Sequence, residues 1–97
     1  MLTACPETDA KVAHKMGLRC LHAEGSIRQE CWHDDVGLRY LSRPAFSSDL
    51  TLAGEMLVWL RHQRGIVAMD GTEGSWCCEC HYAKTPNLAL CAAVLAV

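Results

Sequence analysis

The chain has 97 residues, which is enough for a single folded domain over residues 1–97 and leaves nothing for a second core. Hydrophobic residues make up 51% and charged residues 21%, so the composition excludes a disordered chain and a fibrous repeat. The formal net charge of −2 argues against nucleic-acid binding, which needs a clear excess of positive charge.

Cysteine is overrepresented, with seven residues in the chain. This odd number cannot pair completely within one molecule. Residues 1–10 lack the basic start and the apolar stretch of a secretory signal, so we expect a cytoplasmic protein with reduced thiols. No apolar run approaches the roughly eighteen residues that a membrane span needs, so we expect no membrane association.

The first half of the chain is predicted to form a helix and a β-hairpin. An early proline and acidic residues in the first turn favour a helix over residues 6–16. Residues 18–23 and 27–33 are predicted strands, joined by a turn at Gly25-Ser26. Residues 38–41 fit either a short extra strand or a loop, because Pro44 forbids regular pairing beyond them.

A central helix is the clearest element in the second half. Ser47 or Ser48 is its predicted cap, Asp49 lies at its positive end, and Gly65 is suited to its C-cap. Its apolar residues recur at helical spacing: Leu50, Ala53, Met56, Leu57 and Leu60.

The remaining residues are predicted to form two strands and a last helix. Residues 66–69 and 76–82 are the expected strands, with a turn over 70–74 between them. Thr85-Pro86 begins the helix as its cap and first position. Alternation along the second strand places on one face Trp76, Cys78, Cys80 and Tyr82, and on the other Cys77, Glu79 and His81.

The resulting order α-β-β-α-β-β-α predicts an α+β fold with one antiparallel four-stranded sheet and helices packed on it. Three stretches carry a resemblance. Residues 9–17 end a first helix in Met-Gly, residues 43–50 contain Pro and then Phe-Ser-Ser-Asp before the central helix, and residues 85–95 combine Thr-Pro with Leu-Cys-Ala-Ala-Val. Taken in order, they resemble the phage ABA sandwich domain, a family of small proteins from bacteriophages and prophages.

This resemblance covers nearly the whole chain, and its matching residues are caps, a turn and packing positions. It implies the layered fold and a phage or prophage gene product acting in the bacterial host cytoplasm. It implies no catalytic residues. The chain departs from the family pattern in its many cysteines and histidines.

A zinc site is the sharpest chemical alternative. The Cys-x-His pairs Cys20/His22 and Cys31/His33 each place two soft ligands on one face of a predicted strand, so two neighbouring strands could present four ligands. Cysteines that fill a sheet–helix interface as small hydrophobic residues explain the pattern more simply. We therefore expect no cofactor, with zinc at these four residues as the alternative.

No constellation predicts catalysis. The chain lacks a phosphate-binding glycine loop and a paired general acid and base. Cys80 and His81 are neighbours on a predicted strand, where adjacent side chains point to opposite faces. We expect a protein that is not an enzyme.

Partner contacts are predicted from aromatic and basic residues. Trp59 lies on the central helix and Trp32 in the hairpin, and each could either fill the core or mark a contact surface. Arg61 and Arg64 lie in the last turn of the helix, where cations also complement the helix dipole. Trp59, Arg61, Arg64 and Trp32 are the predicted partner-binding residues.

We therefore expect a small phage accessory protein that binds another protein, most specifically an inhibitor of a bacterial defence system, as anti-CRISPR proteins are. Its partner would be a host defence protein or effector complex, an expectation drawn from analogy of size and context. Three alternatives stay open: a zinc-stabilised binding module, a sponge for a nucleotide signal and a phage morphogenesis protein. The oligomeric state is left open as well.

Overall fold

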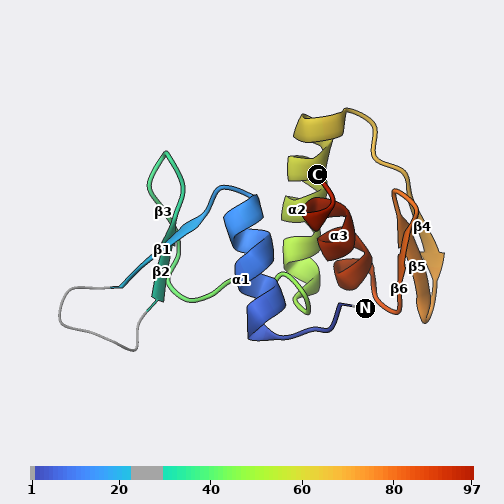
Figure 1. The fold of residues 1–97 in the computed structure, drawn as a ribbon, viewed down its shortest axis with the longest axis horizontal. Helices are drawn as coiled ribbons and strands as arrows, with labels where there is room; N and C mark the ends of the chain where they lie inside the picture. Colours follow the sequence, from blue (N-terminus) through green and yellow to red (C-terminus); the bar gives the residue numbers. More distant parts are fainter. Residues whose placement is uncertain (1, 23–29) are drawn as a thin grey trace.

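The computed structural model describes residues 2–22 and 30–97. Three helices lie between two small sheets, one at each end of an elongated molecule of 45 × 26 × 20 Å (Figure 1). The elements in chain order are α1 Pro6–Lys15, β1 Arg19–His22, β2 Glu30–His33, β3 Leu38–Tyr40, a 3-10 turn Leu50–Leu52, α2 Ala53–Arg64, β4 Met69–Thr72, β5 Ser75–Cys78, β6 His81–Ala83 and α3 Pro86–Leu95.

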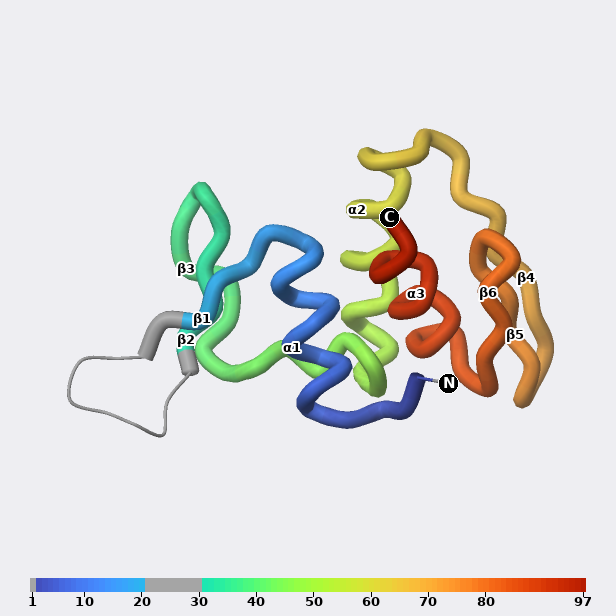
Figure 2. Tube along the Cα trace, in the orientation of Figure 1, coloured from blue at the N-terminus to red at the C-terminus, as the bar shows by residue number. Residues whose placement is uncertain are grey.

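The predicted α+β class is confirmed, but the single four-stranded sheet is wrong. The described residues form two antiparallel three-stranded sheets, β1-β2-β3 and β4-β5-β6. Figure 2 shows the three helices in space between the two sheets. Each sheet therefore needs its own apolar face covered, and the molecule is longer than one layered sheet would make it.

The predicted strand over residues 76–82 is in fact a hairpin. Glu79 and Cys80 have φ angles of 48° and 69° and form a two-residue turn between β5 and β6. Because non-glycine residues rarely adopt this left-handed conformation, the alternating pattern did not indicate a turn. In the observed register Cys78 pairs with His81 and Cys77 with Tyr82, so Tyr82 shares a face with Cys77 and the predicted faces are wrong there.

Strand β4 also lies later in the chain than predicted. Gly71 was expected in a turn, but it pairs with Trp76 inside the sheet. A Cβ atom at Gly71 would stand 2.6 Å from Trp76 Cδ2, so the glycine makes room for the indole ring. The chain reverses instead after Thr72, where Gly74 takes a φ of +81°.

The first sheet contains the predicted hairpin and the extra strand. β2 pairs with both β1 and β3, so residues 38–40 form a strand rather than a loop. The predicted turn at Gly25-Ser26 lies outside the described residues. β3 leads directly into the loop before α2, which brings one edge of this sheet close to that helix.

The three predicted helices are confirmed within a few residues. Val12 of α1, Met56 of α2 and Leu90 of α3 are buried together in one core. Thr85 caps α3 as predicted, since its Oγ1 accepts the N–H of Leu88 at 3.2 Å. None of the helices in residues 2–22 and 30–97 is long and apolar enough to cross a membrane.

The predicted cap at Ser47 or Ser48 is wrong, because Ser47 has a different role. Its N–H and its hydroxyl both donate to Asp9 Oδ1, at 2.8 and 2.5 Å, and both residues are buried. Asp49 caps the turn before α2 instead, where its Oδ1 accepts the N–H of Thr51 at 3.0 Å. Asn87 completes the network by donating to the carbonyl oxygens of Phe46 and Asp49. These bonds fix the loop that leads into α2.

Candidate functional site

The structure separates the four predicted partner-binding residues. Trp32 is only 1% exposed and its ring lies 5.2 Å from that of His14, so it belongs to the core and offers no surface to a partner. Trp59 is half-buried on α2. Arg61 and Arg64 are exposed in the last turns of the same helix. The candidate surface is therefore on α2.

A groove of about 510 Å³ lies along the end of this helix. We call it the α2 groove; its lining residues are Val58, Arg61, His62, Gly65 and Ile66. Val58, Arg61, His62 and Gly65 follow helical spacing and therefore share one side of the helix. Ile66 is 93% exposed and Val58 54% exposed, so two aliphatic side chains face solvent beside basic groups.

The helix end explains why Ile66 is so exposed. Gly65 has a φ of +84° and its N–H donates to the carbonyl oxygen of Arg61 at 2.8 Å, which ends α2. Strand β4 begins only at Met69, so Ile66 follows the cap directly and lies outside any strand. Of the predicted strand over residues 66–69, only Met69 lies in a strand, as the first residue of β4.

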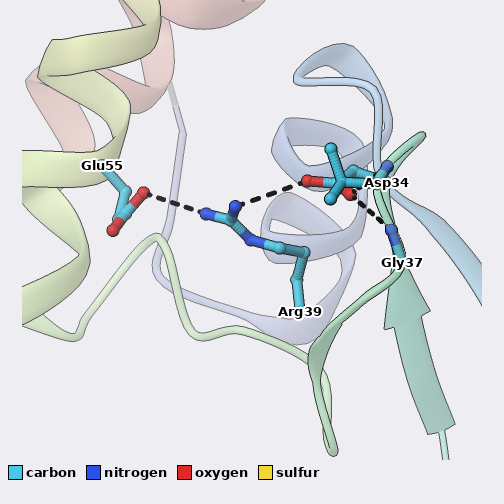
Figure 3. Close-up of polar contacts among 5 residues, drawn as sticks. Asp34, Gly37, Arg39 and Glu55 are labelled. Carbon is cyan, nitrogen blue, oxygen red and sulfur yellow. Dashed lines mark hydrogen bonds and ion pairs between the residues drawn. The ribbon is translucent and has the colours of Figure 1, made fainter.

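A second depression lies on the other side of Val58 and His62, between α2 and the first sheet. It is a cleft of about 190 Å³ whose walls include Tyr40 and Trp59. Arg39 spans it from β3: Arg39 Nη1 lies 3.4 Å from Asp34 Oδ2, and Arg39 Nη2 lies 3.6 Å from Glu55 Oε2 on α2 (Figure 3).

The turn after β2 fixes the Asp34 carboxylate. Its Oδ1 accepts the N–H groups of Val36 and Gly37 at 2.8 and 3.0 Å. The Val36 N–H is the main reason why the pKa of Asp34 lies below its ordinary value, and Arg39 lowers it further. Across the cleft, burial and then the charge of Glu55 raise the pKa of Tyr40.

The geometry of this cleft is poorly matched to a nucleotide. Ligand pockets for drug-sized molecules have about 300–1,000 Å³, so this cleft is smaller than that range. Two carboxylates already accompany Arg39, and they would repel a phosphate group. The ion pairs of Arg39 across the cleft connect the first sheet to α2. The cleft lies beside the α2 groove and shares Val58 and His62 with it.

The residues of the zinc alternative do not share one face of the hairpin. Cys20 pairs directly with Trp32, and Cys31 pairs with Leu21, so Cys20 and Cys31 belong to opposite faces. His33 pairs with Arg19 and shares the face of Cys31, whereas the side chain of His22 lies outside the described residues. Within the described part of the chain, no group of three or more His, Cys, Asp or Glu residues could hold a metal ion.

Two features escaped the sequence reasoning. Ile66 was assigned to a strand, but it directly follows the C-capping Gly65 and is 93% exposed. The spacing Cys77-x-x-Cys80 was also overlooked; it lies at the β5–β6 hairpin, where Cys77 pairs with Tyr82. Comparison of the chain with protein-family models, curated proteins and solved structures finds no match.

Proposed function

We propose that this protein acts without catalysis by binding another protein through the α2 groove. The observation that carries the proposal is the exposure of Ile66, at 93%, and of Val58, at 54%, side by side in a concave surface. Burial of an aliphatic side chain of this size in a complex stabilises it by about 1.5–3 kcal/mol. A single anchor of this kind changes an affinity by roughly 10- to 100-fold.

The charges around the groove indicate the chemistry of the partner. Arg61, His62 and Arg64 occupy the last turns of α2, and no ion pair within the described residues involves the guanidinium of Arg61 or Arg64. A complementary partner presents an apolar side chain for Ile66 and Val58, with carboxylates around it for the arginines. Arg61 and Arg64 would thus bind carboxylates of the partner in addition to complementing the helix dipole.

The biological role that fits this surface is the one the family resemblance suggested. We propose a phage-encoded accessory protein that inhibits a bacterial defence system, in the manner of an anti-CRISPR protein that occupies a surface of its effector complex. What supports this role is the combination of small size, an exposed binding surface and the resemblance to phage ABA sandwich domains. The role is an analogy of context rather than of fold-specific chemistry.

The experiment uses the tagged full chain expressed in a bacterium with an active CRISPR system. Wild type is compared with Ile66→Ser and Arg61→Glu, which alter the groove, and with Val36→Ser. Val36 is 94% exposed in the turn after β2 and is the matched control for loss of an exposed aliphatic side chain. Two quantities are measured: recovery of the host protein that co-purifies, and plating of a phage that the system targets.

The proposal predicts that wild type and Val36→Ser recover the same stoichiometric host complex and restore phage plating. Ile66→Ser and Arg61→Glu are expected to lose at least tenfold in recovered complex. Equal recovery by all four proteins would refute the groove as the binding surface. Binding that depends on the groove without any effect on plating would keep the binding proposal and remove the anti-defence role.

A further inference from the structure

The cleft between α2 and the first sheet has an apolar inner end. Phe46 is 0% exposed and Leu18 6% exposed, yet both line the cleft, so they form its floor. The rings of Tyr40 and Phe46 lie 6.2 Å apart in an edge-to-face arrangement. Trp59 of α2 is half-buried and also lines the cleft. Aromatic rings from β3, from the loop before α2 and from α2 itself therefore meet at one small space.

The volume of this space fits one six-membered ring. The cleft holds about 190 Å³. An apolar cavity of about 150 Å³ is large enough to bind benzene, whereas pockets for drug-sized ligands begin at about 300 Å³. The size that argues against a nucleotide therefore suits a single aromatic ring. Aromatic walls offer such a ring edge-to-face or offset-stacked contacts.

The charged groups at the outer end of the cleft favour an uncharged ligand. Arg39 Nη1 lies 3.4 Å from Asp34 Oδ2, and Arg39 Nη2 lies 3.6 Å from Glu55 Oε2 (Figure 3). Both carboxylates among the described lining residues are thus engaged by one guanidinium. An anion would meet these two carboxylates, and a cation would have to displace Arg39 from them. The ion pairs use the edge of the guanidinium, so its flat face is left to stack on a ring.

The position of the cleft indicates where such a ring comes from. Val58 and His62 line both the cleft and the α2 groove, so a partner that covers Ile66 reaches the cleft across these two side chains. Aromatic side chains are enriched among the anchors of protein interfaces. We propose that the cleft is a receptor for one uncharged aromatic side chain, phenylalanine or tyrosine, of the protein that binds the α2 groove. The source of the ring rests on the proposed function, whereas the ring site itself does not.

The ring site is tested without the partner, by titration of the isotope-labelled full chain with p-cresol, which carries the ring and hydroxyl of tyrosine. Amide shifts in the NMR spectrum locate the bound ring and give its dissociation constant, which for so small a ligand is expected on the order of 1 mM. Methylammonium is titrated in parallel as a small cation without a ring. Wild type is compared with Arg39→Ala and Trp59→Leu, which alter the cleft.

Each of these variants has a matched control. Arg19→Ala removes another exposed arginine of the first sheet, which pairs with Asp35 at 3.9 Å, outside the lining of the cleft. Trp76→Leu removes another half-buried tryptophan, on β5 of the second sheet. Circular dichroism checks the fold of every variant before titration. Arg39 has a side chain that is 45% exposed, so Arg39→Ala keeps the test valid if Trp59→Leu does not fold.

The proposal predicts that p-cresol shifts the amides of the cleft in wild type and in both controls, with equal affinity. Arg39→Ala should bind it about two- to fivefold more weakly, and Trp59→Leu about two- to tenfold more weakly. Absence of shifts at the cleft in wild type would overturn the ring site. Affinity in folded Arg39→Ala equal to or above that of wild type, or binding of methylammonium in place of p-cresol, would overturn it as well.

Co-purification from the bacterial host then tests the source of the ring. Arg39→Ala and Trp59→Leu should recover less of the host complex than wild type, and their controls should recover the same amount. Full recovery by variants that have lost affinity for p-cresol would overturn the partner as the source. Recovery of a complex by a wild type that does not bind p-cresol would refute the ring site and keep the α2 groove. A wild type that binds p-cresol but recovers no host protein would refute the proposed function, and with it the partner as the source, and keep the ring site.

Discussion

Asn87 is the residue whose removal tests the packing of the α2 loop most sharply. Its side-chain Nδ2 donates to Phe46 O at 2.9 Å and to Asp49 O at 2.7 Å, and the residue is buried. Asn87→Ala leaves both carbonyl oxygens without this donor. Each lost bond in such a buried place destabilises a protein by about 1–1.5 kcal/mol, so together we expect about 2–3 kcal/mol.

For a domain of this size, a loss of 1 kcal/mol lowers the melting temperature by about 4–8 °C, so Asn87→Ala is expected to lower it by about 10–20 °C. Urea denaturation followed by circular dichroism gives the free energy of unfolding. The slope of the transition should stay unchanged. Ser48→Ala, an exposed neighbour in the same loop, is the control and should change stability by less than about 0.5 kcal/mol. A loss below that size in Asn87→Ala would refute the role of this network.

Three further predictions concern the cleft and the thiols. Glu55→Gln removes an ion pair between side chains that are nearly half exposed, so it should change the free energy of unfolding by less than about 1 kcal/mol in urea denaturation. The folded state lowers the pKa of Asp34 below the unfolded value of 3.8. The carboxylate therefore stabilises the fold above pH 3.8, and this contribution is lost as the pH falls through the lower folded pKa. Acid denaturation of wild type should show this loss of stability, and Asp34→Asn should lack it. A hydrogen bond with Thr8 lowers the pKa of Cys5, whereas burial raises the pKa of Cys91 to about 12. A disulfide reagent at neutral pH should label Cys5 in the folded protein and Cys91 only after unfolding, as read by mass spectrometry of the labelled peptides.

Each of these three predictions has an outcome that contradicts it. A loss of several kcal/mol in Glu55→Gln would mean that the Arg39 network is part of the core rather than of the surface. Labelling of Cys91 in the folded protein at the rate of Cys5 would contradict the burial of α3. For Asp34, identical acid transitions in wild type and Asp34→Asn would show that the turn bonds do not depend on the carboxylate.

The helices could be predicted because their signals are local. Each signal acts at one helix end: Pro6 at the start of α1, Thr85 before Pro86, and Gly65 after α2. The exception is Ser47, whose hydroxyl looks like a cap in the sequence but bonds Asp9 across 38 residues. No local pattern reveals that partner.

The sheets were harder to predict because pairing depends on distant residues and on turn geometry. The turn at Glu79 and Cys80 contains neither glycine nor asparagine, so residues 76–82 kept the alternation of one strand. The position of Gly71 under Trp76 is a contact between strands, whereas in the sequence a glycine after aspartate indicates a turn. These two errors misplaced the strands of the second sheet. No local pattern showed that the two hairpins belong to separate sheets.

The predicted partner residues are placed only in part on one surface. Trp59, Arg61 and Arg64 lie on α2 and Arg61 lines the α2 groove, and their role in partner binding stays a prediction. Trp32 could not be distinguished from them in the sequence, because a tryptophan fits a core and a contact surface equally well. Ile66 was missed since its exposure depends on where β4 begins.

The binding surface is tested most directly by amide hydrogen exchange of the full chain, alone and in complex with the host protein that it recovers. The proposal predicts slower exchange on binding over residues 58–66, with little change in the β5–β6 hairpin. Slower exchange confined to the first sheet or to that hairpin, with residues 58–66 unaffected, would contradict it.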